Sequence, residues 1–472
     1  MTLQHSPDSA PKPSGSEESP GKKIWDLAWP QLLMMFFHFW IGFFDVYVAG
    51  RISEDVQAAL GLITQTLLFF LIVAMALSNG AVSTISQSLG AGRILRAKRY
   101  VGLCLLLVLG AGMFLLLVGF IFKQHLLLLL QVPPRIQDIT GQFLLIYLIL
   151  TPVYYLFLVS NAVFRAQKQV HIPLFSMVLV TGLNTWADFG LCFGIYGLPE
   201  MGYMGLAWAT LISVIGGCLF NTVVLAKRGW LRLAHFPPLR WIKKGLPYLW
   251  RVAWPAGMMQ VLWHSGYLVL FAITASLPRE EVVALAALAA GLRMESLLFL
   301  PAVAFNMTAS ILVGHYLGSK DFAGARSIGL RTWAFGCLFI TLLGVVLWQF
   351  VPELARLLSQ KAAVQAEIAN YLHFNILAIP FTGTTMILGG VFIGAGATRF
   401  NMFAIGGTVW LVRLPLAFAL GHLVFVSATG IWAAMLISQM IQATLMFLLF
   451  SYKDWYRFSM QSRKVQPQAA GA

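Results

Sequence analysis

The stretch WPQLLMMFFHFWIGFFDVYVAGR (residues 29–51) decides the class of the fold. It is apolar almost throughout, with Pro30 near its start and one carboxylate, Asp45, near its end. About 20 apolar residues cross a hydrocarbon core roughly 30 Å thick, so the stretch predicts a membrane span. A carboxylate costs roughly 3 kcal/mol or more inside such a span, and its presence therefore indicates a functional position.

The composition extends this prediction to a protein that crosses the membrane many times. Of the 472 residues, 59% are hydrophobic and only 10% are charged, against about 25% charged in soluble proteins. The net charge of +15 comes from basic residues between apolar spans, which indicates topology and not nucleic-acid binding. The cysteines lie within apolar spans without metal-ligand spacing, so neither a disulfide framework nor a metal site is expected; they are Cys104, Cys192, Cys218 and Cys337.

Twelve apolar spans are predicted, six in each half of the chain. We expect a disordered cytoplasmic tail over residues 1–24, an N-lobe over 25–226, a basic cytoplasmic linker over 227–246, a C-lobe over 247–452 and a second cytoplasmic tail over 453–472. The Lys and Arg residues between spans gather on alternate connections, which predicts that both termini are cytoplasmic and that the protein lies in the plasma (inner) membrane.

An internal repeat relates the two halves. Trp29-Pro30 recurs as Trp254-Pro255, and Leu89-Gly90 recurs as Leu317-Gly318 with nearly the same offset in the numbering. Because six spans are an even number, both halves enter the membrane from the same side, which predicts a pseudo-two-fold axis along the membrane normal. This all-α architecture is typical of transporters, and it argues against a simple channel or a membrane-anchored enzyme.

Three carboxylates are predicted to lie well inside spans: Asp45, Asp188 and Glu295. Asn184 precedes Asp188 by four residues and His38 precedes Asp45 by seven, so each pair shares a helical face. Two carboxylates in one cavity repel each other when both are ionised, which favours a proton between them. The alternative is that each acid is neutral and hydrogen-bonded for structural reasons.

Two further features have a structural and a functional interpretation. Glu295 lies two residues from Arg293, so a structural ion pair is as good an explanation as a coupling role, with His264 as another polar group of the same half. Pro30 removes a helical hydrogen bond, so a bend there would move Asp45.

Several segments resemble the multidrug and toxin extrusion (MATE) family. They are DVYVAGR (45–51), SQSLGAGRILRAKR (86–99), the Asn184/Asp188 pair, RMESLLFLPAVAFNMTASILVGHYLG (293–318) and RLPLA (413–417). The resemblance implies twelve helices in two lobes and a secondary antiporter. Such antiporters exchange H⁺ or Na⁺ for organic, often cationic, compounds by rocking between outward-open and inward-open states.

The resemblance also assigns roles to residues of this chain. It implies a coupling site of Asp45, Asn184, Asp188 and Thr210, as in the DinF-type branch, with Pro30 as the hinge of the first span. It also places His38 and Asn161 in the substrate cavity, and we expect Met34 and Ile41 of the first span to line that cavity as well. The NorM-type branch places acids in spans 7 and 10. Span 7 of this chain has none, and span 10 has only Glu367 at its mouth, so a C-lobe polar site would consist of His264, Glu295 and Arg293.

We therefore expect a monomeric transporter of small organic molecules among membrane lipids. It would need no cofactor besides the coupling ion, with H⁺ preferred to Na⁺. A lipid-linked precursor flippase is an alternative, but it favours a strongly cationic cavity, and only Arg293 and Arg413 lie deep in spans. A membrane-embedded transferase is a second alternative, but no constellation of nucleophile and base is present.

Overall fold

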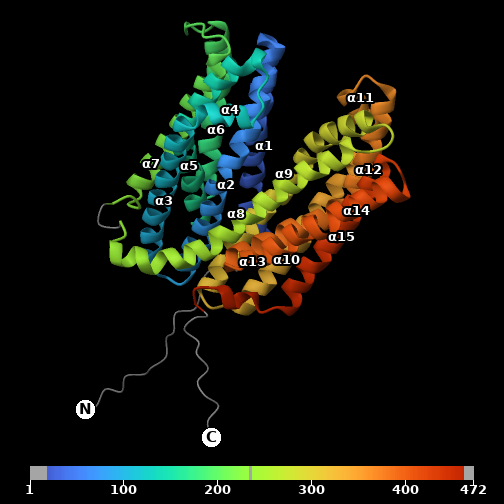
Figure 1. The fold of residues 1–472 in the computed structure, drawn as a ribbon. Helices are drawn as coiled ribbons and strands as arrows, with labels where there is room; N and C mark the ends of the chain where they lie inside the picture. The colour runs from blue at the N-terminus through green and yellow to red at the C-terminus, as the bar shows by residue number, and fades with distance from the viewer. Residues whose placement is uncertain (1–18, 233–235, 462–472) are drawn as a thin grey trace, which may run out of the picture.

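The computed structural model describes residues 19–232 and 236–461, and this part of the chain is helical, with turns and without a strand. Twelve helices are long and apolar enough to cross a membrane, which confirms the predicted number. The first six spans form the N-lobe and the last six form the C-lobe (Figure 1).

The N-lobe contains six spanning helices and two short ones. The spanning helices are α1 (Pro20–Ile52), α2 (Glu54–Gly90), α3 (Ile94–Ile121), α5 (Gln137–Ala166), α6 (His171–Phe193) and α7 (Met204–Lys227). Between α3 and α5 lie α4 (Lys123–Leu129) and the 3₁₀ turn η1 (Pro134–Ile136). The turn between α1 and α2 is a single residue, Ser53, whose side chain accepts a hydrogen bond from Val56 N and so caps α2.

The C-lobe repeats this order with one irregular span. Its regular spans are α8 (Leu239–Ala275), α9 (Glu281–Gly318), α10 (Phe322–Trp348), α12 (Ala362–Ala395) and α15 (Ala428–Tyr452), with the short α11 (Val351–Leu358) after α10. The eleventh span alternates α13 (Thr398–Asn401) and α14 (Leu414–Phe418) with π-helical η3 (Met402–Gly406), η4 (Val409–Arg413) and η5 (Ala419–Val424). π-Helical segments within α-helices often lie at functional positions.

The structure shortens the predicted tails and linker. Helix α1 begins at Pro20, because Ser19 caps it through Lys22 N, so residues 20–24 are helical. Helix α8 begins at Leu239, inside the predicted linker. After α15 the chain forms the 3₁₀ turn η6 (Trp455–Phe458), whose buried Trp455 stacks on Phe450. Residues 1–18 and 462–472 of the predicted tails lie outside the described residues.

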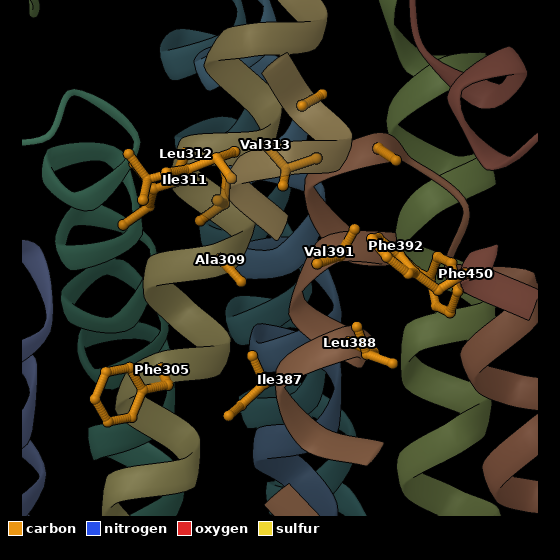
Figure 2. Packing of buried hydrophobic residues seen from close by; sticks show 14 of the residues in the cluster. Phe305, Ala309, Ile311, Leu312, Val313, Ile387, Leu388, Val391, Phe392 and Phe450 are labelled. Carbon is orange, nitrogen blue, oxygen red and sulfur yellow. The ribbon is translucent and has the colours of Figure 1, made fainter. Parts of the chain in front are cut away.

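The two lobes meet near the chain ends and diverge away from them (Figure 1). Helix α2 of the N-lobe packs against α8 and α9 of the C-lobe, and α1 packs against α9. The C-lobe side of this region is an apolar cluster in which Phe305 and Ala309 of α9 lie near Ile387 and Leu388 of α12 (Figure 2).

We call the contact of α2 with α9, together with the adjoining ends of α5 and α12, the interlobe seam. It shows the repeat in three dimensions. Gln87 Nε2 donates to Gly394 O at 2.8 Å, and His315 Nε2 donates to Ala166 O at 2.8 Å. The offset that relates Leu89-Gly90 to its repeat also relates Gln87 to His315 and Ala166 to Gly394. The two hydrogen bonds therefore exchange under the repeat, as a pseudo-two-fold axis through the seam requires.

Two close contacts of glycines at the seam are also related to each other by the repeat. A Cβ on Gly90 would overlap the carbonyl group of His315, and a Cβ on Gly318 would overlap the carbonyl oxygen of Gln87. Gly90 and Gly318 are themselves equivalent positions of the repeat. Both glycines are therefore needed because the two backbones approach so closely.

Candidate functional site

A cavity of about 190 Å³ lies inside the N-lobe. Helices α1, α2, α5, α6 and α7 enclose it, and most of its wall is apolar. Its polar lining consists of His38, Asp45, Thr64, Tyr147, Thr151, Tyr154, Thr210 and Ser213. A small number of polar groups in a largely apolar wall is typical of a site for small organic molecules.

Helix α1 presents its polar groups to this cavity in the predicted register. His38 and Asp45 are seven residues apart, close to two helical turns, and both line the cavity, with Ile41 between them. Asp45 is partly exposed. The acid that was unexplained in the sequence therefore faces an internal space and not the lipid.

Asn184 and Asp188 of α6 lie next to Asp45, behind the cavity wall. Both side chains are 0% exposed. Within the described residues, neither Asp188 oxygen and neither polar atom of the Asn184 side chain has a hydrogen bond of acceptable geometry. Buried polar groups normally have partners, so this arrangement lacks one. A proton or a small cation between Asp45 and Asp188 would supply it.

Thr210 of α7 lines the same cavity, as predicted. Its hydroxyl donates to Leu206 O at 3.0 Å and lies next to Tyr147. The structure thus gathers four predicted coupling residues, from three helices, on one side of the N-lobe cavity: Asp45, Asn184, Asp188 and Thr210.

Two residues predicted to line the cavity do not. Met34 is 3% exposed and belongs to the apolar packing of the N-lobe. Asn161 faces α7, where its Oδ1 accepts a hydrogen bond from Asn221 Nδ2 at 2.9 Å. Asn161 was assigned by resemblance and Met34 from the many Met and Phe residues of the first span, and both side chains contact neighbouring helices and not the cavity.

Helix α5 contributes polar side chains to the cavity that were not predicted from the sequence. Tyr147, Thr151 and Tyr154 all line it. Their spacing of four and three residues puts them on one helical face, and this pattern of polar residues within an apolar span was the available signal.

Pro30 lies within a continuous α1, at the lobe interface. The neighbouring Gln31 donates to Leu27 O at 2.8 Å and to Thr308 Oγ1 of α9 at 2.9 Å. The first half of α1 is thereby attached to the other lobe, while Asp45 lies about 22 Å further along the helix.

The C-lobe polar site differs from the one predicted. Glu295 is 4% exposed and accepts hydrogen bonds from the hydroxyl groups of Tyr371 and, at 3.5 Å, Tyr267. The prediction that Arg293 belongs to this site is wrong, because Arg293 is exposed and lines neither C-lobe cavity. Glu295 lines two cavities on the C-lobe side, of about 20 and 510 Å³. His264 lines the larger one, and the arginine that lines the smaller one is Arg413.

Within the described residues, no group of three or more His, Cys, Asp and Glu side chains is placed to hold a metal ion.

Comparison with known proteins identifies the family. The MatE family model matches residues 30–189 and 255–419, one match in each half of the chain. The chain is similar to the probable multidrug resistance protein NorM of Thermotoga maritima, with 25% identity over 94% of this chain and 95% of the relative. It is also similar to the protein of the same name from Bradyrhizobium diazoefficiens, with 26% identity over 86% and 88%.

A solved MATE transporter of Vibrio cholerae has the same fold, with a TM-score of 0.85 and 21% identity over 93% of this chain and 98% of that one. Assignment to the DinF-type branch stays a prediction. Because the family model covers more than half of the sequence, the chain belongs to the MatE family and is a multi-pass membrane transporter, not an enzyme.

Proposed function

We propose that this transporter is a secondary antiporter that extrudes organic, often cationic, small molecules in exchange for H⁺. The observation that carries the proposal is the meeting of two carboxylates, Asp45 of α1 and Asp188 of α6, at the wall of the N-lobe cavity. Multidrug resistance proteins among the relatives support the class of cargo.

The coupling follows from the charge on Asp45. When Asp45 is ionised, its carboxylate attracts a cationic cargo into an apolar cavity, where the attraction is stronger than in water. Protonation removes that charge and releases the cargo. Each proton that moves inward contributes about 2.3 kcal/mol per 100 mV of membrane potential, enough to maintain a gradient of cargo.

Na⁺ is the alternative coupling ion. The oxygens of Asp45, Asn184, Asp188 and Thr210 could coordinate it. A proton needs only one acceptor, whereas a bare cation needs several oxygens, and the rest of the lining is mostly apolar. We therefore favour H⁺, with no other cofactor.

The arrangement of the lobes supports alternating access. The lobes are closed at the end that carries the chain termini and diverge at the other end (Figure 1). With both termini in the cytoplasm of a cell bounded by the plasma membrane, this is an outward-open state of a monomer. Pro30 lies where α1 leaves the lobe interface, so bending there would move Asp45 relative to the C-lobe.

The flippase alternative has less support. A lipid pyrophosphate requires several cations in the cavity wall. The described linings of the N-lobe cavity and of both C-lobe cavities contain a single lysine or arginine, Arg413.

The test is ethidium efflux from proteoliposomes under an imposed pH gradient, with and without Na⁺. We expect Asp45→Asn and Asp188→Asn to abolish the dependence on the pH gradient, and the exposed Asp138→Asn to behave as wild type. Wild-type rates in both cavity variants would disprove the coupling role, and dependence on Na⁺ alone would disprove the preference for H⁺.

A further inference from the structure

The C-lobe contains a counterpart of the N-lobe cavity. With the offset of the Trp-Pro pair, His38 and Gly42 correspond to Trp263 and Tyr267; with that of the Leu-Gly pair, Leu67 and Tyr147 correspond to Glu295 and Asn375. The first residue of each correspondence lines the N-lobe cavity, and its counterpart lines the C-lobe cavities. The duplication that produced two lobes therefore produced two cavities.

The charges in the two cavities differ. The N-lobe cavity has Asp45, with Asp188 on α6 behind it, whereas the span that corresponds to α6 contributes Arg413, at the end of π-helical η4. A guanidinium repels protons and metal cations, so this lobe is not built for a second coupling ion. A guanidinium binds acidic groups instead.

Arg413 is held rigidly, but one of its nitrogens is unused. The side chain is 3% exposed; its Nε donates to Ser438 Oγ at 2.9 Å and its Nη2 to Gln439 Oε1 at 2.6 Å. The guanidinium lies 5.3 Å from the ring centre of Trp263 and 5.9 Å from that of Tyr267. Its Nη1 has no hydrogen-bond partner among the described residues.

Space for a ligand adjoins the Arg413 side chain. Arg413 lines a void of about 20 Å³ that shares Trp263, Tyr267 and Glu295 with the 510 Å³ cavity between α2, α8, α9 and α12. The small void suits one oxygen-bearing head group, and the larger cavity suits an aromatic or aliphatic body.

Glu295 does not neutralise Arg413 directly. Its carboxylate accepts from Tyr371 and Tyr267, and among the described residues it forms no ion pair with Arg413 within 4 Å. A buried charge without a partner is costly, so a ligand that brings one is stabilised. The negative charge of Glu295 in the same space repels a phosphate with two negative charges about twice as strongly as a carboxylate with one.

We propose that the void beside Arg413 and the adjoining cavity form a binding subsite for cargo that carries a single carboxylate, held by the Arg413 guanidinium, with the body of the molecule against Trp263. The inference rests on the proposed function in so far as the ligand is transport cargo. It extends the cargo from cations to organic acids and zwitterions.

The test measures binding to the purified full-length protein in lipid nanodiscs, without an ion gradient, by the fluorescence of two probes. Dansylglycine carries a carboxylate, and dansylglycinamide is its neutral isostere. Since a hydrogen bond to a charged group contributes substantially more than a neutral one, wild type should bind dansylglycine about 10-fold more tightly than the amide. Empty nanodiscs report probe that partitions into lipid.

Variants then locate the carboxylate. We expect Arg413→Gln to remove the preference for dansylglycine and leave binding of the amide unchanged, while Arg413→Lys keeps part of the preference. Arg293→Gln, which changes an exposed arginine two residues from Glu295, should keep all of it.

Equal affinities in wild type would overturn the proposal, and so would an Arg413→Gln effect of the same size on both probes. The wild-type comparison needs no variant and stands even if Arg413→Gln fails to fold. Because binding is measured without a gradient, the result is independent of whether the Asp45 and Asp188 variants lose ion coupling.

Discussion

Substituting Gly90 by alanine should weaken the closed interlobe seam. The new Cβ would overlap the carbonyl oxygen of His315 and lie 2.8 Å from its carbonyl carbon, well below ordinary van der Waals contact. His315 belongs to a backbone that cannot rotate away, so α2 and α9 must separate by about 1 Å to relieve the overlap. In the reciprocal contact, a Cβ on Gly318 would lie 2.9 Å from Ala91 N.

The expected cost follows from this overlap. Inserting one methyl group into a close-packed contact costs about 1–3 kcal/mol. The cost applies to the conformer in which the seam is closed and is absent when the lobes separate there. A cost of about 2 kcal/mol changes the ratio of the two conformers about 30-fold, since 1.4 kcal/mol corresponds to a factor of ten.

The change can be measured as a distance between the far ends of the lobes. Spin labels at Leu129 of α4 and Leu357 of α11, which are 79% and 81% exposed, report that distance by pulsed electron resonance after the native cysteines are replaced. We expect Gly90→Ala to increase the population with short distances, because opening at the seam brings the far ends together. Gly110→Ala is the matched control, since nothing lies within 4 Å of its added Cβ.

A distance distribution for Gly90→Ala that matches that of Gly110→Ala would refute the reasoning. It would mean either that the seam accommodates a methyl group or that the protein does not open there.

Three other contacts give predictions of different size. Gln31→Leu removes the hydrogen bond to Thr308 and should shift the same spin-label distances in the same direction, because the closed conformer loses about 1 kcal/mol of stabilisation. Unchanged distances would show that this hydrogen bond does not hold the lobes closed. Trp432→Phe removes the indole N–H that donates a hydrogen bond to Glu367 Oε1 in the C-lobe, and it should lower the thermal unfolding midpoint. An unchanged midpoint would show that water replaces the lost donor. Arg135→Ala removes an ion pair whose arginine side chain is 78% exposed and should leave that midpoint unchanged, since such pairs contribute below about 1 kcal/mol; a clear decrease would contradict this.

The fold was predictable because lipid permits few alternatives. A chain in the membrane must satisfy its backbone within each span, so length and apolarity fix the number of helices. The repeat was visible at Trp29-Pro30 and Leu89-Gly90, and it fixed the relation of the halves. The role of the repeated glycines at the seam became visible only in the structure. No sequence pattern shows that Gly90 contacts the backbone of α9 and that Gly318 contacts the backbone of α2.

The candidate site was predictable only where chemistry restricts orientation. Asp45 and Asp188 are costly in lipid, so both had to face the interior. Met34 carries no such restriction, because lipid and protein core are equally apolar, and Asn161 could satisfy its amide against α7 as well as in the cavity. Arg293 is exposed and Arg413 is buried, and no pattern in the sequence distinguished the two arginines.

Under the proposed coupling to H⁺, the unequal charges of the lobes place the response to the ion in the N-lobe. Binding a proton at Asp45 or Asp188 changes the net charge of the N-lobe cavity, whereas Glu295 and Arg413 already bring opposite charges to the C-lobe. The ion should therefore act on α1, which carries Asp45 at one end and is attached to α9 through Gln31 at the other. A conformational change that begins in the N-lobe would thus reach the C-lobe through this helix, and would alter the space beside Arg413 without any titration there.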